Sequence, residues 1–353
     1  MTGLRRFSPS LRIAAASAII AGVLWPSTGL AENRVERFDV ISRPITQFRI
    51  GSSERHFGAL EFMGGLEMTA ANREFGGLSA IRFLDAGRNF LGVSDTGFWY
   101  AGQIDRDADG HPSGFSHFRM APLLDQAGKP FERKRDADAE SLAISGDSVT
   151  VGFEREHRLL EYRLDTQDFA SVPKTLPLPL PREELRRNAS LEAVAVSPGS
   201  GPLGSTSVVL TEKSLNENGD IFAAVLAGPH RGIFYVKRTD NFDISDAVFL
   251  PDGDLLILER QYALVSGVAL RIRRIKSETI RPGATVDGVV MLKADMSYQI
   301  DNMEGIDVWT DSEGHQVLSL ISDDNYSLWQ RNLYLEFRLA EKIAGAKTAR
   351  TTP

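Results

Sequence analysis

Residues 136–162, DADAESLAISGDSVTVGFEREHRLLEY, contain the pattern that decides the fold. Two short β-rich runs flank a Gly146-Asp147 turn, which predicts an antiparallel hairpin. Acidic residues precede the first run and follow the second. Because an antiparallel hairpin sets the start of its first strand beside the end of its second, we expect Glu140 and Glu154 to be neighbours.

The same hairpin pattern occurs five times along the chain. Its equivalent positions are Gly77, Glu140, Glu192, Asp246 and Glu304, at intervals of 63, 52, 54 and 58 residues by subtraction. Repeats of this size with several short strands are typical of β-propeller blades. We therefore predict an all-β fold, a single β-propeller of six blades. Its sixth blade would pair residues 58–68 with the C-terminal strand 333–339, which removes open sheet edges.

The N-terminal residues predict export. Arg5, Arg6 and Arg12 precede an apolar stretch that ends near Trp25, and small residues lead up to Ala31. This pattern is typical of a signal peptide over residues 1–31 and predicts a periplasmic or secreted protein. The Arg5-Arg6 pair leaves open the twin-arginine route or the general route. We expect the propeller domain at residues 32–342 and a flexible tail at 343–353.

Composition excludes several classes of function. The chain has 353 residues, a formal net charge of -7 and no cysteine. A nucleic-acid binder needs clustered Lys and Arg, so we expect no such partner. The lack of cysteine excludes disulfides, thiolate metal sites and a cysteine nucleophile. No segment after the signal reaches the ~20 apolar residues of a membrane span.

One short helix is predicted at residues 181–187, where Pro and acids precede arginines.

The hairpins would gather carboxylates around one axis at one face, with Asp246 among them. Crowded like charges need compensating cations, so we expect either Arg and Lys partners or calcium or another divalent metal. The candidate metal ligands are Asp95, Glu140, Glu154, Glu192, Glu212, Glu259, Glu304 and Asp323. Three bases directly follow strand-ending acids and are candidates for binding an anionic substrate: Arg155, Lys213 and Arg260. His157 and Glu154 are the candidate acid–base residues.

Several motifs resemble the phytase-like family, whose members are described as having esterase-like activity of phytase. They are FGGLS at 75–79, VSDTG at 93–97, AESL at 139–142, GFER at 152–155, LEAV at 191–194, MEGI at 303–306, SDDN at 322–325 and QRNL at 330–333. The resemblance implies a β-propeller in which a carboxylate ring holds calcium ions and Lys and Arg take phosphate oxygens.

Three functions follow as hypotheses. The first is an exported, metal-dependent hydrolase of phosphate or other esters, a monomer acting on a small anionic or ester substrate. The second is a periplasmic propeller that binds a ligand or partner without chemistry, its acids paired in a structural salt-bridge ring. The third is a lactonase-like, calcium-dependent esterase, which would show no preference for phosphate.

Overall fold

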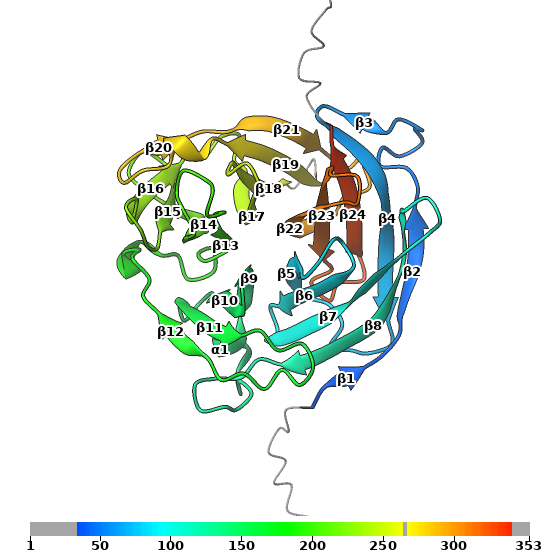
Figure 1. Cartoon of the computed structure of the whole chain (residues 1–353), viewed down its shortest axis with the longest axis horizontal. Coiled ribbons are helices and arrows are strands. Elements are labelled where there is room, and N and C mark those ends of the chain that lie inside the picture. The colour runs from blue at the N-terminus through cyan, green and yellow to red at the C-terminus, as the bar shows by residue number, and fades with distance from the viewer. Residues whose placement is uncertain (1–33, 264–266, 341–353) are drawn as a thin grey trace, which may run out of the picture. The chain divides into compact units, whose positions relative to one another are not determined.

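The protein forms a five-bladed β-propeller. The structure is a computed structural model and describes residues 34–263 and 267–340. The predicted signal peptide, residues 1–31, and the predicted tail, residues 343–353, lie outside the described residues. Five antiparallel sheets stand around one axis as blades (Figure 1).

Each blade begins with an inner strand and continues outward. Blade 1 contains β5 (Leu78–Phe83), β6 (Asn89–Ser94), β7 (Phe98–Arg106), β8 (Pro112–Pro122) and β1 (Glu36–Arg37). Blade 2 contains β9 (Ala139–Ser145), β10 (Ser148–Phe153), β11 (Arg158–Arg163) and β12 (Lys174–Leu176). Blade 3 contains β13 (Ala193–Val196), β14 (Ser207–Leu215), β15 (Ile221–Val225), β16 (Gly232–Val236) and β20 (Thr285–Val286), the last paired in parallel with β16.

The last two blades complete the ring. Blade 4 contains β17 (Asp243–Phe249), β18 (Leu255–Ala263), β19 (Gly267–Ile275) and β21 (Val289–Ala294). Blade 5 contains β22 (Asn302–Thr310), β23 (Gln316–Asp323), β24 (Asn332–Leu339), β4 (Leu60–Ala70), β2 (Val40–Ile45) and β3 (His56–Phe57). The inner strands contact one another in the order β5, β9, β13, β17, β22 and back to β5.

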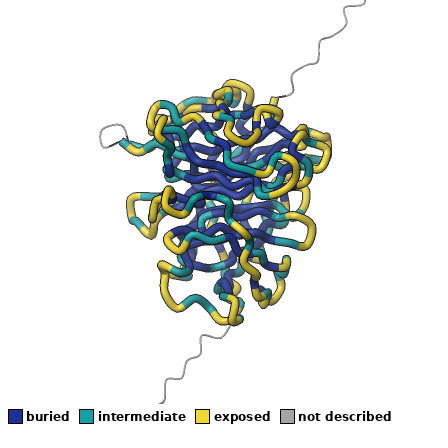
Figure 2. The backbone as a smooth tube through the Cα atoms, turned by 90° about the vertical axis from the view of Figure 1, so that its left-hand side faces the viewer, coloured by how far each residue is buried: buried dark blue, intermediate teal, exposed yellow. Residues whose placement is uncertain are grey.

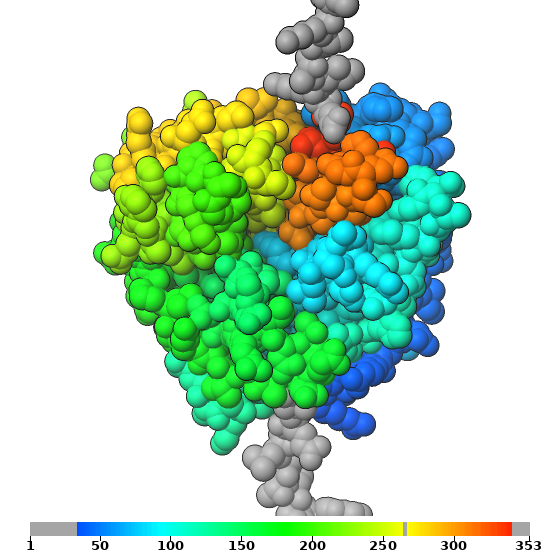
Figure 3. Space-filling view, in the orientation of Figure 1, coloured from blue at the N-terminus to red at the C-terminus, as the bar shows by residue number. Residues whose placement is uncertain are grey.

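The prediction of six blades was wrong, although the predicted pairing of the chain ends is confirmed. β4 pairs with β24 from Asn332 opposite Met68 to Leu339 opposite Leu60. This pair does not form a separate blade, because β24 also pairs with β23 and thereby extends the fifth hairpin. The space-filling view shows the N-terminal blue residues beside the C-terminal red ones where the ring closes (Figure 3).

The core lies between the blades. Buried apolar side chains form five clusters, and each contains residues of two neighbouring blades. Between blades 1 and 2, for example, Val93 and Trp99 pack with Val151 and Tyr162. The tube coloured by burial shows buried strands and exposed connecting loops (Figure 2). Since both faces of a sheet are covered, most strands are apolar along much of their length.

A buried ion pair between Arg82 and Asp246 joins the inner strands. Arg82 of β5 donates to both carboxylate oxygens of Asp246 on β17, at 2.8 Å each. It also donates to the backbone carbonyls of Val194 on β13 and Ile306 on β22. Arg82 therefore connects four of the five inner strands, and the predicted place of Asp246 in the carboxylate ring was wrong.

Helical structure is confined to single turns within the described residues. They are α1 (Lys134–Ala137), η1 (Arg182–Glu184) and η2 (Ser277–Thr279). The helix predicted at residues 181–187 shrinks to η1 because Leu185 already has extended dihedral angles, φ -77° and ψ 121°. None of these helices has the length or the apolar character needed to cross a membrane.

Candidate functional site

The inner strands share an irregularity that directs side chains toward one face. In β5, β9, β17 and β22 the pairing with the second strand skips one residue. The skipped residues are Ser79, Glu140, Ser245 and Glu304, and Glu192 stands at the same place just before β13. A β-bulge of this kind bends the strand and re-aims the extra side chain.

The ends of the second strands supply the other half of the ring. The first residue after each bulge pairs with a second-strand residue, for example Ser141 with Gly152 and Asp246 with Leu258. Two residues further along lie five equivalent side chains: Asp95, Glu154, Glu212, Arg260 and Asp323. Four blades therefore contribute a carboxylate, and blade 4 contributes an arginine.

These positions surround a cavity of about 860 Å³. The cavity is lined by seven of the predicted carboxylates, Asp95, Glu140, Glu154, Glu192, Glu212, Glu304 and Asp323, and by Lys213 and Arg260. The predicted residues Arg155, His157 and Glu259 do not line it. The expectation that Glu140 and Glu154 are neighbours is confirmed, since oxygens of Asp138, Glu140 and Glu154 lie within 4.8 Å of one another.

Glu259 lies elsewhere because its register differs by one residue from that of Glu154. It faces Arg271 and Arg273 on β19, with contacts of 2.7 Å to each, and all three side chains are buried. Neighbouring residues of a strand point to opposite sides of the sheet, so a shift of one residue exchanges Glu259 for Arg260 at the ring. Glu259 therefore belongs to a buried salt bridge and not to the cavity.

Arg260 binds the carboxylates of the blades on either side. Its guanidinium donates to Glu212 at 3.1 Å, to Asn302 at 2.9 Å and to Glu304. Lys213 donates to Asp243 of the next blade at 2.7 Å. Arg155 instead donates to Asp138 within its own blade.

The opposite side of the cavity has more carboxylates than cations. No hydrogen bond or ion pair to Glu140 occurs among the described residues, and Oδ1 of Asp95 is buried without a hydrogen-bond partner in that part of the chain. Burial raises the pKa of Glu140 well above its usual value, and the charges of Glu154 and Asp138 raise it further. Burial likewise raises the pKa values of Glu154 and Asp323 to about 7.

Glu192 is a second carboxylate of the ring, and the neighbouring charge of Glu154 disfavours its ionisation. Burial, together with the charges of Glu154 and Glu212, raises the pKa of Glu192 well above its usual value. Glu192 can therefore hold a proton near neutral pH.

Ser190 holds three of the ring residues in place. Its backbone N–H donates to Oε1 of Glu154 at 2.5 Å, and its carbonyl accepts from the N–H groups of Glu192 and Glu212. Its hydroxyl lies 2.7 Å from Nδ1 of His157. Burial and the charge of Arg182 lower the pKa of His157. His157 therefore contacts the residue that positions Glu154 rather than the cavity itself.

Two contributors to the site were absent from the predicted ligand set. Asp138 precedes Glu140 by two residues, directly before β9, and its oxygens lie close to those of Glu140 and Glu154. The alternation of acids in DADAE was thus a usable signal. Lys134, whose Nζ lies 2.9 Å from Oδ2 of Asp95, comes from α1 and has no comparable sequence signal.

The comparison with protein families identifies the chain. The family described as "Phytase-like: Esterase-like activity of phytase" matches residues 73–326 of 353. The chain belongs to this phytase-like family. No curated protein matches the sequence.

Solved structures resemble the phytase-like chain only distantly. The PQQ-bound aldose sugar dehydrogenase of Streptomyces coelicolor is 13% identical with a TM-score of 0.43, covering 74% of this chain and 95% of its own. The allergen Mala s 1 of Malassezia sympodialis is 10% identical with a TM-score of 0.39, covering 88% and 99%. Likenesses this remote carry no information about ligand or activity.

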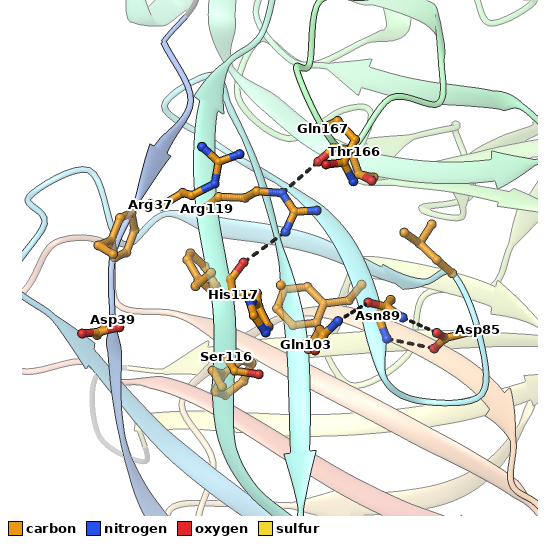
Figure 4. A pocket seen from close by; sticks show the side chains of 16 residues that line it. Arg37, Asp39, Asp85, Asn89, Gln103, Ser116, His117, Arg119, Thr166 and Gln167 are labelled. Atoms are coloured by element: carbon orange, nitrogen blue, oxygen red, sulfur yellow. Dashed lines mark hydrogen bonds between the residues drawn. The ribbon is translucent and has the colours of Figure 1, made fainter.

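The phytase-like chain has other polar groups away from the ring. Asp107, Asp109 and His111 cluster in the turn between β7 and β8, and a similar group lies between β22 and β23. A cavity of about 980 Å³ lies on blade 1 and includes Arg37, Arg119 and Gln103 (Figure 4). None of the predicted site residues lines that cavity.

Proposed function

We propose that the carboxylate-lined cavity hydrolyses phosphate or other esters with the help of a divalent cation such as calcium. The observation that carries this proposal is the group formed by Asp138, Glu140 and Glu154, whose oxygens lie within 4.8 Å of one another. Carboxylate oxygens are the donors that hard divalent cations prefer. Membership of a family described by esterase-like activity supports the reaction class.

The residues that would hold the cation are Asp138, Glu140 and Glu154. Asp95 would contribute Oδ1, which is buried without a hydrogen-bond partner among the described residues. A bound divalent cation supplies polarisation of an ester oxygen and compensation of negative charge. The remaining tasks fall to the chain. Glu192, whose pKa burial raises well above its usual value, can hold a proton that is given to a leaving group. Arg260 and Lys213 are the cations that an anionic group in the cavity would meet.

A binding protein without chemistry is the second candidate, and the salt bridges of Arg260 support it. This side chain links Glu212 to Glu304 across blade 4, as a structural ring would require. The hydrolase would turn over an ester, whereas the binding protein would not. A lactonase-like esterase differs from the leading proposal only in having no preference for phosphate.

Hydrolysis assays decide between these functions. We expect calcium-dependent turnover of 4-nitrophenyl phosphate or 4-nitrophenyl acetate, lost with EDTA and lowered at least ~100-fold by Glu140→Gln, in keeping with an essential catalytic group. Glu278→Gln is the matched control, because Glu278 is exposed in η2 and outside the cavity. Absence of turnover with calcium, magnesium, manganese or zinc would favour the binding protein. Turnover of the acetate alone would favour the lactonase-like esterase.

A further inference from the structure

Exposed apolar side chains form one wall of the carboxylate-lined cavity. Tyr262 at the end of β18, Met296 before β22 and Trp329 between β23 and β24 line it. Their exposed fractions are 74%, 52% and 93%. They belong to blades 4 and 5, whereas Glu140 and Glu154 belong to blade 2, across the ring. The apolar side chains of the cavity therefore come from blades 4 and 5, which also contribute Asp243, Asp301, Glu304 and Asp323 to its lining.

The loop that carries Trp329 is held by hydrogen bonds to the site itself. The N–H of Asn325 donates to the ring carboxylate of Asp323 at 2.8 Å, and the N–H of Ser327 donates to the carbonyl of Asp324 at 2.7 Å. At the other end, the N–H of Arg331 donates to Asp301 at 3.2 Å. A large aromatic side chain kept exposed on an anchored loop beside a cavity is suited to contact a ligand.

The cavity is poorly suited to a polyanion. Among its described lining residues the only Lys and Arg are Lys213 and Arg260, and both bind carboxylates of the protein. A ligand with many phosphate groups would need several uncommitted cations. The lining does offer neutral amides that can bond to uncharged oxygens, including Asn188, Gln261 and Gln330.

We infer that the substrate is an ester with at most one negative charge and with a flat apolar group that packs on Trp329 and Tyr262. The ester end lies toward Glu140 and Glu154, and the apolar group lies toward blades 4 and 5. This inference rests on the proposed ester hydrolysis and narrows its substrate class. It favours aromatic or otherwise apolar esters over phytate, which carries many charges and no apolar surface.

Binding measurements on the full chain test the apolar wall without relying on turnover. By calorimetry with calcium present, we expect naphthalene-2-sulfonate to bind at least tenfold more tightly than methanesulfonate. Trp329→Ala should weaken the binding of naphthalene-2-sulfonate roughly fivefold to tenfold, the range of an aromatic contact. Trp329→Phe should retain most of the wild-type affinity. Leu328→Ala is the matched control, because Leu328 is fully exposed on the same loop but does not line the cavity.

Kinetics with esters then separate the two proposals. We expect Trp329→Ala to raise the KM for 1-naphthyl acetate and to leave the KM for ethyl acetate unchanged. Leu328→Ala should change neither KM. If no ester is hydrolysed but naphthalene-2-sulfonate binding depends on Trp329, the proposed hydrolysis is contradicted and the proposed apolar contact is supported. If esters are hydrolysed but Trp329→Ala behaves like Leu328→Ala, or phytate is the better substrate, the inference is overturned while the reaction stands.

Discussion

Glu140 is a cavity carboxylate that no cation of the described residues compensates directly. It sits in a β-bulge of β9, close to Asp138 and Glu154, and receives no hydrogen bond or ion pair from the described residues. Burial and these two neighbours raise its pKa well above the usual value. In the metal-free protein its charge opposes folding, whereas in a metal-bound protein the same charge would be a ligand.

The charge of Glu140 should therefore destabilise the metal-free protein and stabilise the metal-bound one, and substituting this residue tests both effects. We expect Glu140→Gln to stabilise the metal-free protein by roughly 1–3 kcal/mol at pH 8, because it removes an uncompensated charge. Urea unfolding in EDTA measures this difference, with Glu278→Gln as the control. The same variant should lose the stabilisation that calcium confers on the wild type. A Glu140→Gln protein that is less stable in EDTA would contradict the account.

The entry into β5 is the element on which the position of Asp95 depends. Gly77 has φ +62°, and a Cβ added there would lie 2.1 Å from Oδ1 of Asp95. The backbone carbonyl of Gly77 also accepts from the N–H of Asp95. Only glycine leaves room for this carboxylate at the start of the inner strand.

A pair of glycine variants tests this arrangement. Gly146 in the β9–β10 turn also has positive φ, +57°, but an added Cβ there meets nothing within 4 Å. We expect Gly146→Ala to cost about 1 kcal/mol of unfolding free energy from backbone strain alone. Gly77→Ala should cost more than that and should also weaken calcium binding, measured by titration calorimetry. Equal effects of the two variants on calcium binding would show that Asp95 has no part in the site.

Elements that depend on neighbouring residues, such as a hairpin and its turn, were predicted well from the sequence. Positions that depend on pairing between distant segments were not. The Gly146-Asp147 turn fixes its own hairpin, so the proximity of Glu140 and Glu154 followed from spacing alone. Asp246 and Glu259 were misplaced because each stands one residue away from the ring positions of blade 4, which Ser245 and Arg260 occupy, so matching acid to acid between repeats gave the wrong register there. The apolar wall was missed because Tyr262 and Trp329 meet only when blades 4 and 5 stand side by side.

The number of blades is a property of the whole chain. Counting hairpins found the five inner pairs, but the extra strands at the two ends suggested a sixth blade. β4 and β24 instead complete blade 5, because β24 follows the last hairpin directly and pairs with it. Closure by strands from both ends ties the ring together and leaves the ring carboxylates of blades 1, 2, 3 and 5, with Arg260 of blade 4, facing one cavity.

The central claim, that the ring holds a divalent cation, predicts how the stability of the whole molecule depends on pH. The folded-state pKa values of Glu154 and Asp323, about 7, lie above those of an unfolded chain. The metal-free folded protein therefore binds more protons between pH 4 and 7, and its stability falls as pH rises through this range. His157, with a lowered pKa, acts in the opposite direction. Seven aspartates of the described residues with lowered pKa values also act in the opposite direction, but they gain their stabilising effect mainly below about pH 5, where unfolded carboxylates titrate: Asp85, Asp107, Asp136, Asp165, Asp254, Asp295 and Asp311.

The most direct measurement is the free energy of unfolding in urea at pH 5 and pH 8, with EDTA and with excess calcium. We predict that the protein in EDTA is less stable at pH 8 than at pH 5, and that calcium reverses this difference. At a concentration of 100 times its Kd, calcium should add about 2.7 kcal/mol at pH 8 and much less at pH 5. Stability in EDTA that rises from pH 5 to pH 8, with no response to calcium, would contradict a metal-binding ring.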